Sequence, residues 1–380
     1  MVRFNPVSKR IGLVGRTSRI VFHRSFSSQS PADVIDGASD KVIKSTHAFL
    51  EDATPEKLLE LTATYWRRLR CAKPLLLTCN IDKAVEMRCA DAILATGATC
   101  HATTDINALL DKLTLNKESQ GIIGCYINVD SFATKVDTYK EACESLNKCC
   151  NSIMVDISMP LDFQPAHFTR IDEMVTPKKD NNILTQLALL KPDVIRFIHG
   201  TWQYFAAIAP EEMFSQLQEN DTDMAKLNRC NTISERYNAV VIDCGMIRFV
   251  NTRQHADMYP IMMNASDREG VVFPRSLSIL KKIHGFDSMA GGVIAAMLSV
   301  SSSKSMLACI TSIIGIDYSS EKCVDISEGP GTLAVNFVDK IHRISTSPDN
   351  LLKHDSPIKF LKRVNVPIDG EHGPLCANSE

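Results

Sequence analysis

Short apolar runs and longer amphipathic stretches alternate along most of the chain. A buried strand is predicted at 75–79, and further strands are predicted at 99–103, 122–127, 153–156, 194–197 and 240–242. Helical periodicity between them predicts helices at 84–95, 139–150 and 224–237. Strands and helices in alternation predict an α/β fold of three layers, in which helices cover both faces of a mostly parallel central sheet. Ligands of such sheets bind at the carboxyl ends of the strands.

The pattern changes toward both ends of the chain. Helices are predicted at 289–300, 305–316 and 329–344, and short antiparallel strands at 248–250 and 259–263. Residues 36–61 predict one or two helices, in which Thr54 and Pro55 have the residue types of an N-cap and a first helical position. The predicted organisation is therefore a basic segment at 1–30, a helical extension at 31–60, a main domain at 61–346 and a tail at 347–380.

The first thirty residues have a composition of their own. They contain five arginines and one lysine but no Asp or Glu, and they end in a serine-rich run at 25–30. Basic and apolar residues interleave, so a helix here would be amphipathic, as a mitochondrial presequence requires. The lack of a continuous apolar stretch argues against a secretory signal. These features predict mitochondrial import; a disordered basic tail would leave the missing acidic residues unexplained.

Composition excludes several other classes of protein. The formal net charge of -2 creates no general attraction to nucleic acid or to an anionic membrane. The 13 cysteines form no C-x-x-C pair and have no histidines at zinc-site spacing, so we expect core thiols in a reducing compartment. No apolar run approaches the roughly 18 residues of a membrane span.

Four segments resemble, in the same order, the motifs of the hydroxyethylthiazole kinase family. They are the strand, helix and turn at 77–103, the strand at 194–207, the turn and helix at 285–300, and the helix at 329–339. Members of that family are ribokinase-like enzymes that phosphorylate the thiazole alcohol of thiamine salvage with ATP and Mg²⁺. The resemblance implies a ribokinase-like fold and a homotrimer with active sites at the subunit boundaries.

The family's phosphate-handling turn corresponds to residues 284–288, His-Gly-Phe-Asp-Ser, which retain one of its glycines, Gly285. In the family, successive backbone amides of this turn face the transferred phosphate, and its last residue, a cysteine, is taken as the base. Ser288 aligns with that cysteine, and a one-residue shift offers Asp287 instead. The alternative is that Asp287 or Ser288 only caps the helix that follows.

Other matched functional positions are partly kept. Asp156 aligns with a family aspartate and is the candidate metal ligand, while Arg196 and Gly245 align with residues on the nucleotide side. Thr201 replaces the glutamate that helps to organise Mg²⁺ and nucleotide. Two structural alternatives remain, namely that Arg196 forms an ion pair at a strand end and that Asp156 caps a loop.

The differences from the family fall on the phosphate site, whereas the scaffold residues are retained. Our first hypothesis is therefore a mitochondrial protein without kinase activity, a scaffold, subunit or assembly factor of a larger complex. The second is a divergent kinase that uses ATP, with Asp287 or Ser288 as base and Mg²⁺ at Asp156. The third is a sensor that binds a nucleotide or a thiazole without turnover.

Overall fold

The computed structural model describes residues 54–80, 83–116, 121–128, 136–157, 183–198, 201, 223–244, 261–264, 269–272, 283–301, 305–353 and 362–365. The predicted presequence, the predicted extension up to residue 53, the predicted strand at 248–250 and the candidate Gly245 lie outside the described residues.

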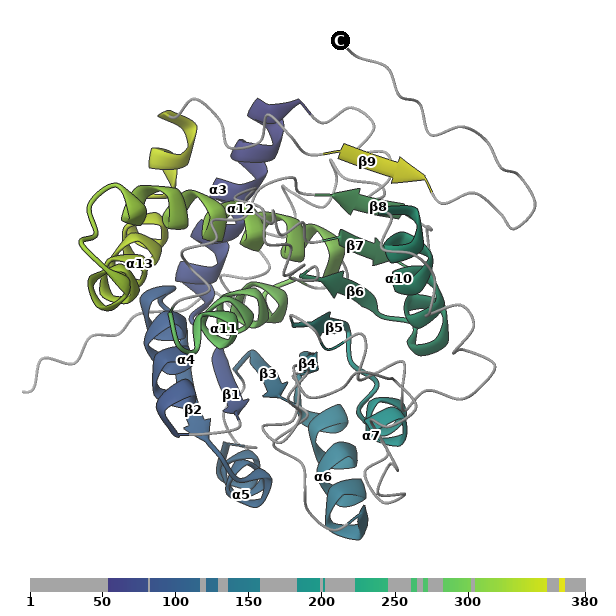
Figure 1. Cartoon of the computed structure of the whole chain (residues 1–380). Coiled ribbons are helices and arrows are strands. Elements are labelled where there is room, and N and C mark those ends of the chain that lie inside the picture. The colour runs from purple at the N-terminus through teal and green to yellow at the C-terminus, as the bar shows by residue number, and fades with distance from the viewer. Residues whose placement is uncertain are drawn as a thin grey trace, which may run out of the picture.

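One sheet of nine strands runs through the described part of the molecule, in the order β2-β1-β3-β4-β5-β6-β7-β8-β9 (Figure 1). Strands β1 to β6 are parallel, and β7 to β9 extend the sheet as antiparallel strands. The mostly parallel central sheet is thereby confirmed. The strands are β1 (Leu75–Cys79), β2 (Thr99–Thr103), β3 (Ile123–Asn128), β4 (Ser152–Ile157), β5 (Val194–Phe197), β6 (Val240–Asp243), β7 (Ile261–Asn264), β8 (Glu269–Val272) and β9 (Lys362–Asn365).

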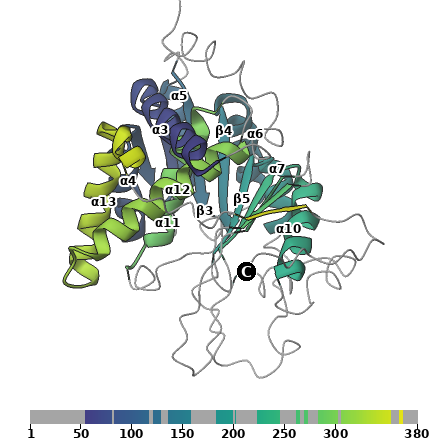
Figure 2. The same cartoon turned by 90° about the horizontal axis from the view of Figure 1, so that it is seen from above.

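Helices cover both faces of this sheet, as the three-layer prediction requires (Figure 2). One layer consists of α3 (Pro55–Ala72), α4 (Lys83–Ala95), α11 (Phe286–Ser299), α12 (Ser305–Val324) and α13 (Pro330–Thr346). The other consists of α5 (Ile106–Asn116), α6 (Val136–Cys149), α7 (Ile183–Leu190) and α10 (Asp223–Tyr237). Because side chains alternate along a strand, Leu76 and Met154 join the first core, while Leu77 and Val155 join the second.

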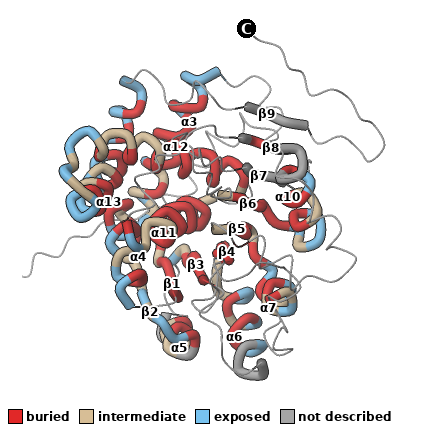
Figure 3. The backbone as a smooth tube through the Cα atoms, viewed as in Figure 1, coloured by how far each residue is buried: buried red, intermediate tan, exposed pale blue. Residues whose placement is uncertain are grey.

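Helix α11 is buried on all its sides in the middle of the first layer (Figure 3). Small residues permit this packing, as their pattern predicts. A Cβ atom added at Gly292 would lie 2.8 Å from the Cys89 sulfur of α4. A Cβ atom at Gly291 would lie 2.6 Å from the hydroxyl of Tyr126 on β3. The glycine pair thus brings α11 close to α4 on one side and to the sheet on the other.

The ends of the domain differ from the prediction. Helix α3 begins as expected, with the Thr54 hydroxyl accepting a hydrogen bond from the Lys57 amide and Pro55 in the first turn, but it continues to Ala72 across the predicted boundary at residue 60. Two segments of the predicted tail at 347–380 have regular structure. A 3-10 helix, η5 (Pro348–Lys353), buries Leu351 in the first core, and β9 pairs with β8.

The described cysteines are free thiols, several of them fully buried. None of the described helices combines the length and the hydropathy needed to cross a membrane.

Candidate functional site

Asp156 and Arg196 lie side by side where β4 and β5 end, because the parallel register pairs these two residues. They point to the face that carries α11, like Met154 and Val194 two residues before them. The carboxyl ends of the strands therefore bring together two of the residues that the sequence proposed for metal and phosphate. Both side chains are buried, with exposed fractions of 0% for Asp156 and 2% for Arg196.

These residues bind one another rather than facing solvent. Arg196 Nε donates to Asp156 Oδ1 at 2.8 Å, and Arg196 Nη2 donates to Asp156 Oδ2. The Tyr126 hydroxyl donates to Asp156 Oδ2 at 2.6 Å. Arg196 Nη2 also donates to the backbone carbonyl of Asp287 in the first turn of α11. We call Tyr126, Asp156, Arg196 and this carbonyl the buried charge network; it joins three strands to the helix above them.

Burial and the ion pair act in opposite directions on the pKa values of this network. Burial raises the pKa of the Asp156 carboxyl, and the charge of Arg196 opposes that shift. Burial alone would lower the pKa of Arg196, but the charge of Asp156 and its hydrogen bond to Arg196, together with neighbouring groups, outweigh burial and raise that pKa. Burial, together with the Asp156 charge, raises the pKa of the Tyr126 phenol, so that its hydroxyl keeps the proton it donates. The ionised pair is satisfied within the protein, as a buried pair must be.

In the turn before α11, Gly285 has a conformation that favours glycine, and Gly285 rather than Asp287 or Ser288 is the N-cap. Gly285 is the N-cap and has φ 80°, a left-handed conformation that favours glycine, and its carbonyl accepts from the Met289 amide at 3.0 Å. The helix begins at Phe286, not at Met289. Asp287 and Ser288 therefore lie inside the first turn, and the alternative that one of them is the N-cap is wrong. Ser288 is buried, whereas Asp287 is partly exposed.

The residues present do not fit the Mg²⁺ ion that the kinase fold implies. Mg²⁺ in kinases takes one or two carboxylates together with waters and substrate phosphates. Here both oxygens of Asp156 accept hydrogen bonds from Arg196 or Tyr126. Thr201, in the place of the family glutamate, donates its buried hydroxyl to the Ile198 carbonyl. Among the described residues, no cluster of three His, Cys, Asp or Glu side chains could hold a metal.

A second buried carboxylate, Glu86 of α4, lies at the carboxyl ends of β1 and β2. Its Oε1 accepts from the Thr78 hydroxyl and, at 3.1 Å, from the Thr103 amide, while Oε2 accepts from the Asn80 side-chain amide. Burial raises the pKa of Glu86, and these hydrogen bonds oppose that shift. Glu86 was not among the residues predicted from the sequence. Its position between Val85 and Cys89, on the buried face of a helix, is the pattern that could have identified it as a buried carboxylate.

No protein-family model matches the sequence, and no curated protein matches it. Among solved structures, a hydroxyethylthiazole kinase protein from Pyrococcus horikoshii OT3 superposes with a TM-score of 0.55 at 16% sequence identity, over 80% of this chain and 99% of that one. This chain has the fold of that kinase. The ribokinase-like fold class predicted from sequence is thus confirmed.

Pyridoxal kinase from Staphylococcus aureus, in complex with ADP, is a more distant neighbour, with a TM-score of 0.45 and 11% identity over 65% of this chain and 87% of that one. At identities this low, the likeness to the thiazole kinase concerns the fold alone. The chemistry of this chain must be argued from its own residues.

Proposed function

We propose that this chain is a mitochondrial protein that uses a kinase-like fold without transferring phosphate, as a scaffold, subunit or assembly factor of a larger complex. One observation carries the proposal. The two charged residues aligned with metal and phosphate ligands, Asp156 and Arg196, are buried and consume each other's hydrogen-bonding groups in the buried charge network.

The physical argument concerns what a phosphoryl-transfer site requires. Catalysis of this reaction comes from positioned amides, cations and a metal that face the transferred group. A phosphate that recruited Arg196 would have to remove the guanidinium from Asp156 and leave a buried carboxylate without its counter-ion, which is strongly unfavourable. The pair instead ties β4 and β5 to α11, which is a structural role.

The scaffold proposal includes the location and the partners. The basic, acid-free first thirty residues support import into mitochondria. Either a homotrimer or incorporation into a larger assembly would supply the partners of such a scaffold. Native size fractionation of mitochondrial extract, with the full chain detected by mass spectrometry, tests this. We expect the protein in fractions larger than one chain, either as a homotrimer or together with other proteins; a free monomer in the soluble matrix would overturn the proposal.

A divergent, ATP-dependent hydroxyethylthiazole kinase is the second candidate, and one observation favours it. Asp287 lies in the first turn of α11 and is partly exposed, so its carboxylate could act as a base at the helix N-terminus. The test is ATP-dependent phosphorylation of the thiazole alcohol by the full chain. If this candidate is correct, the full chain phosphorylates the thiazole alcohol and Asp287→Ala abolishes that activity. If the wild type forms no product, the kinase candidate is wrong.

A sensor that binds a nucleotide or a thiazole without turnover is the third candidate. Like the scaffold, a sensor would form no phosphorylated product. Like the kinase, it would bind the ligand. Calorimetric titration with ATP, Mg²⁺ and the thiazole alcohol separates it from the scaffold, because only the sensor gives saturable heat without product.

A further inference from the structure

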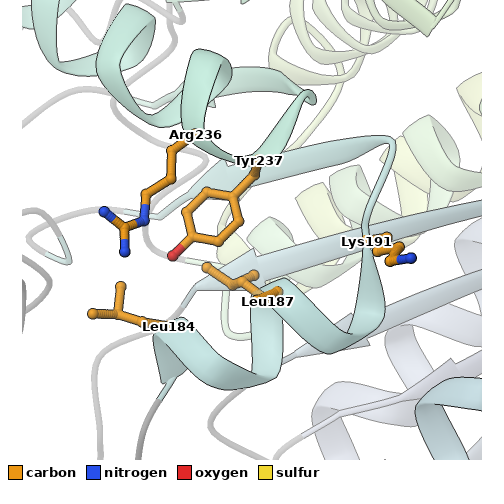
Figure 4. A pocket seen from close by; sticks show the side chains of 6 residues that line it. Leu184, Leu187, Lys191, Arg236 and Tyr237 are labelled. Atoms are coloured by element: carbon orange, nitrogen blue, oxygen red, sulfur yellow. The ribbon is translucent and has the colours of Figure 1, made fainter.

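A groove lies between α7 and α10, on the helix layer opposite to α11 (Figure 4). Its volume is about 250 Å³, and it is lined by Leu184, Leu187, Ala188, Lys191, Arg236 and Tyr237. We call it the α7–α10 groove. Lys191 and Tyr237 each lie three residues before a strand, β5 or β6. The groove therefore reaches the amino edge of the sheet, away from the buried charge network at the carboxyl edge.

One wall of the groove is apolar. Leu184, Leu187 and Ala188 have the i, i+3, i+4 spacing that places them on one face of α7. Leu187 is fully buried, Leu184 is half-buried and Ala188 is exposed, so the wall leads from the core to the solvent. A hydrocarbon chain or ring of a small ligand could be buried along this wall.

The other wall carries a phenol and a guanidinium. The side chain of Tyr237 points across the groove toward α7, and the Arg236 side chain runs beside it (Figure 4). The guanidinium carbon of Arg236 lies 6.0 Å from the centre of the Tyr237 ring. The Tyr237 hydroxyl oxygen is buried and has no hydrogen-bond partner within the described residues. Burial raises the pKa of this phenol and the adjacent Arg236 guanidinium opposes that shift, so the hydroxyl keeps a proton that it can donate at neutral pH.

A purely structural explanation accounts for only part of this arrangement. Arg236 is in the last turn of α10 and Lys191 follows the end of α7, where cations offset the negative ends of the helix dipoles. That explanation leaves the buried hydroxyl of Tyr237 unsatisfied, which costs stability. A ligand that brings an acceptor oxygen to Tyr237 would remove this cost.

The charges favour a single negative charge on that ligand. A carboxylate has two acceptor oxygens, and the Arg236 fork and the Tyr237 hydroxyl supply matching donors. A doubly charged phosphate is disfavoured, because the Lys191 side chain points away from Tyr237 (Figure 4), which leaves Arg236 as the cation beside the phenol among the residues that line the groove. We propose that the α7–α10 groove binds a small organic monocarboxylate whose apolar chain or ring lies against Leu184, Leu187 and Ala188. The proposal is independent of whether the chain transfers phosphate.

Octanoate is a suitable probe, and octanol is its uncharged counterpart. Both are titrated into the full-length protein by calorimetry, with ligand-observed saturation-transfer NMR as a second readout. Three variants change the groove: Arg236→Gln removes the charge, Tyr237→Phe removes only the hydroxyl, and Ala188→Phe fills the open end. Arg343→Gln, an exposed residue of α13 on the other helix layer, is the matched control for loss of an arginine.

We expect saturable binding of octanoate and at least roughly tenfold weaker binding of octanol. Arg236→Gln should weaken octanoate roughly tenfold, and Tyr237→Phe about threefold. Ala188→Phe should abolish binding, and the control should bind like the wild type. Circular dichroism verifies that each variant is folded. Absence of saturable binding, equal affinity for octanol, or unchanged affinity in all three groove variants would overturn the proposal.

Discussion

At the carboxyl edge of the sheet, the polar groups of Tyr126, Asp156 and Arg196 satisfy one another, whereas at the amino edge the Tyr237 hydroxyl has no partner among the described residues. The carboxyl edge contains more charge, yet its charged groups link strands to a helix and so have a structural role. The amino edge contains a buried hydroxyl from which no described residue accepts a hydrogen bond, beside an open groove. We therefore take unmet hydrogen-bonding capacity beside a groove, more than the presence of charged residues, as the indication of a ligand site.

The largest expected effect comes from breaking the ion pair of the carboxyl edge. Arg196→Met leaves the Asp156 carboxylate buried without its counter-ion and should lower the free energy of unfolding by about 3–5 kcal/mol. Urea denaturation followed by circular dichroism measures this loss.

The matched control removes both charges. In the double variant Asp156→Leu with Arg196→Met, both charges of the pair are removed, and we expect a free energy of unfolding within about 1–2 kcal/mol of the wild type. If Arg196→Met is as stable as the wild type, the buried Asp156 carboxylate does not need Arg196 as its counter-ion. That result would contradict the structural role of the pair.

The next largest effect is expected at Gly291, the glycine of α11 that lies against Tyr126 of the same network. Gly291→Ala places a methyl group against the Tyr126 ring and hydroxyl and should cost about 1–3 kcal/mol of unfolding free energy. Gly331→Ala in α13 is the control, because no atom lies within 4 Å of its added Cβ. If both variants lose the same stability in thermal and urea unfolding, the close approach of α11 to β3 is not the cause.

A pair of identical substitutions compares the two edges directly. Tyr126→Phe removes a donor from the buried Asp156 carboxylate and should lower the free energy of unfolding by about 1–2 kcal/mol. Tyr237→Phe removes a buried hydroxyl that has no partner among the described residues, so stability should stay the same or rise by up to about 1 kcal/mol. Equal losses in urea unfolding would remove the distinction between the edges.

The smallest expected effect is a pH dependence at Glu86. Burial raises its pKa in the folded state, so the folded state holds the proton more tightly than the unfolded state. The stabilising contribution of protonated Glu86 is present below its unfolded pKa and is lost as the pH rises through the folded pKa. The stability of the wild type relative to Glu86→Gln should therefore fall as the pH increases from 4.5, the unperturbed pKa of Glu86.

The Gln variant is tolerable because Asn80 has a spare acceptor. Asn80 Oδ1 is buried without a partner in the described part of the chain, so rotation of this amide lets it accept from the new Gln side chain. Urea unfolding at several pH values measures the difference between the two proteins. A relative stability of the wild type that rises with pH would mean that the hydrogen bonds to Glu86 outweigh its burial.

Much of the fold could be predicted from the sequence, because the strands at 75–79 and 194–197 are short, mostly apolar runs with clear limits. Helix α12 was predicted to end at Ile316 but continues to Val324, since Ser319, Ser320 and Cys323 look polar or neutral yet are buried. Strand β9 has no apolar pattern, and it is a strand because the edge of β8 is available for pairing.

The candidate site could be predicted only in part. The sequence identified Asp156 and Arg196, but their pairing depends on the register of β4 against β5, which no local pattern specifies. The contribution of Tyr126 depends on Gly291, more than a hundred residues away in the chain. The α7–α10 groove could not be predicted, because of its two helices only α10, at 224–237, was predicted from the sequence.

Calorimetric titration of the full-length protein with ATP and Mg²⁺, with and without hydroxyethylthiazole, tests the central claim most directly. If the buried charge network has replaced the phosphate site, the titration gives no saturable heat and no phosphorylated thiazole is formed. Saturable heat that Asp287→Ala removes, accompanied by phosphorylated product, would contradict the account.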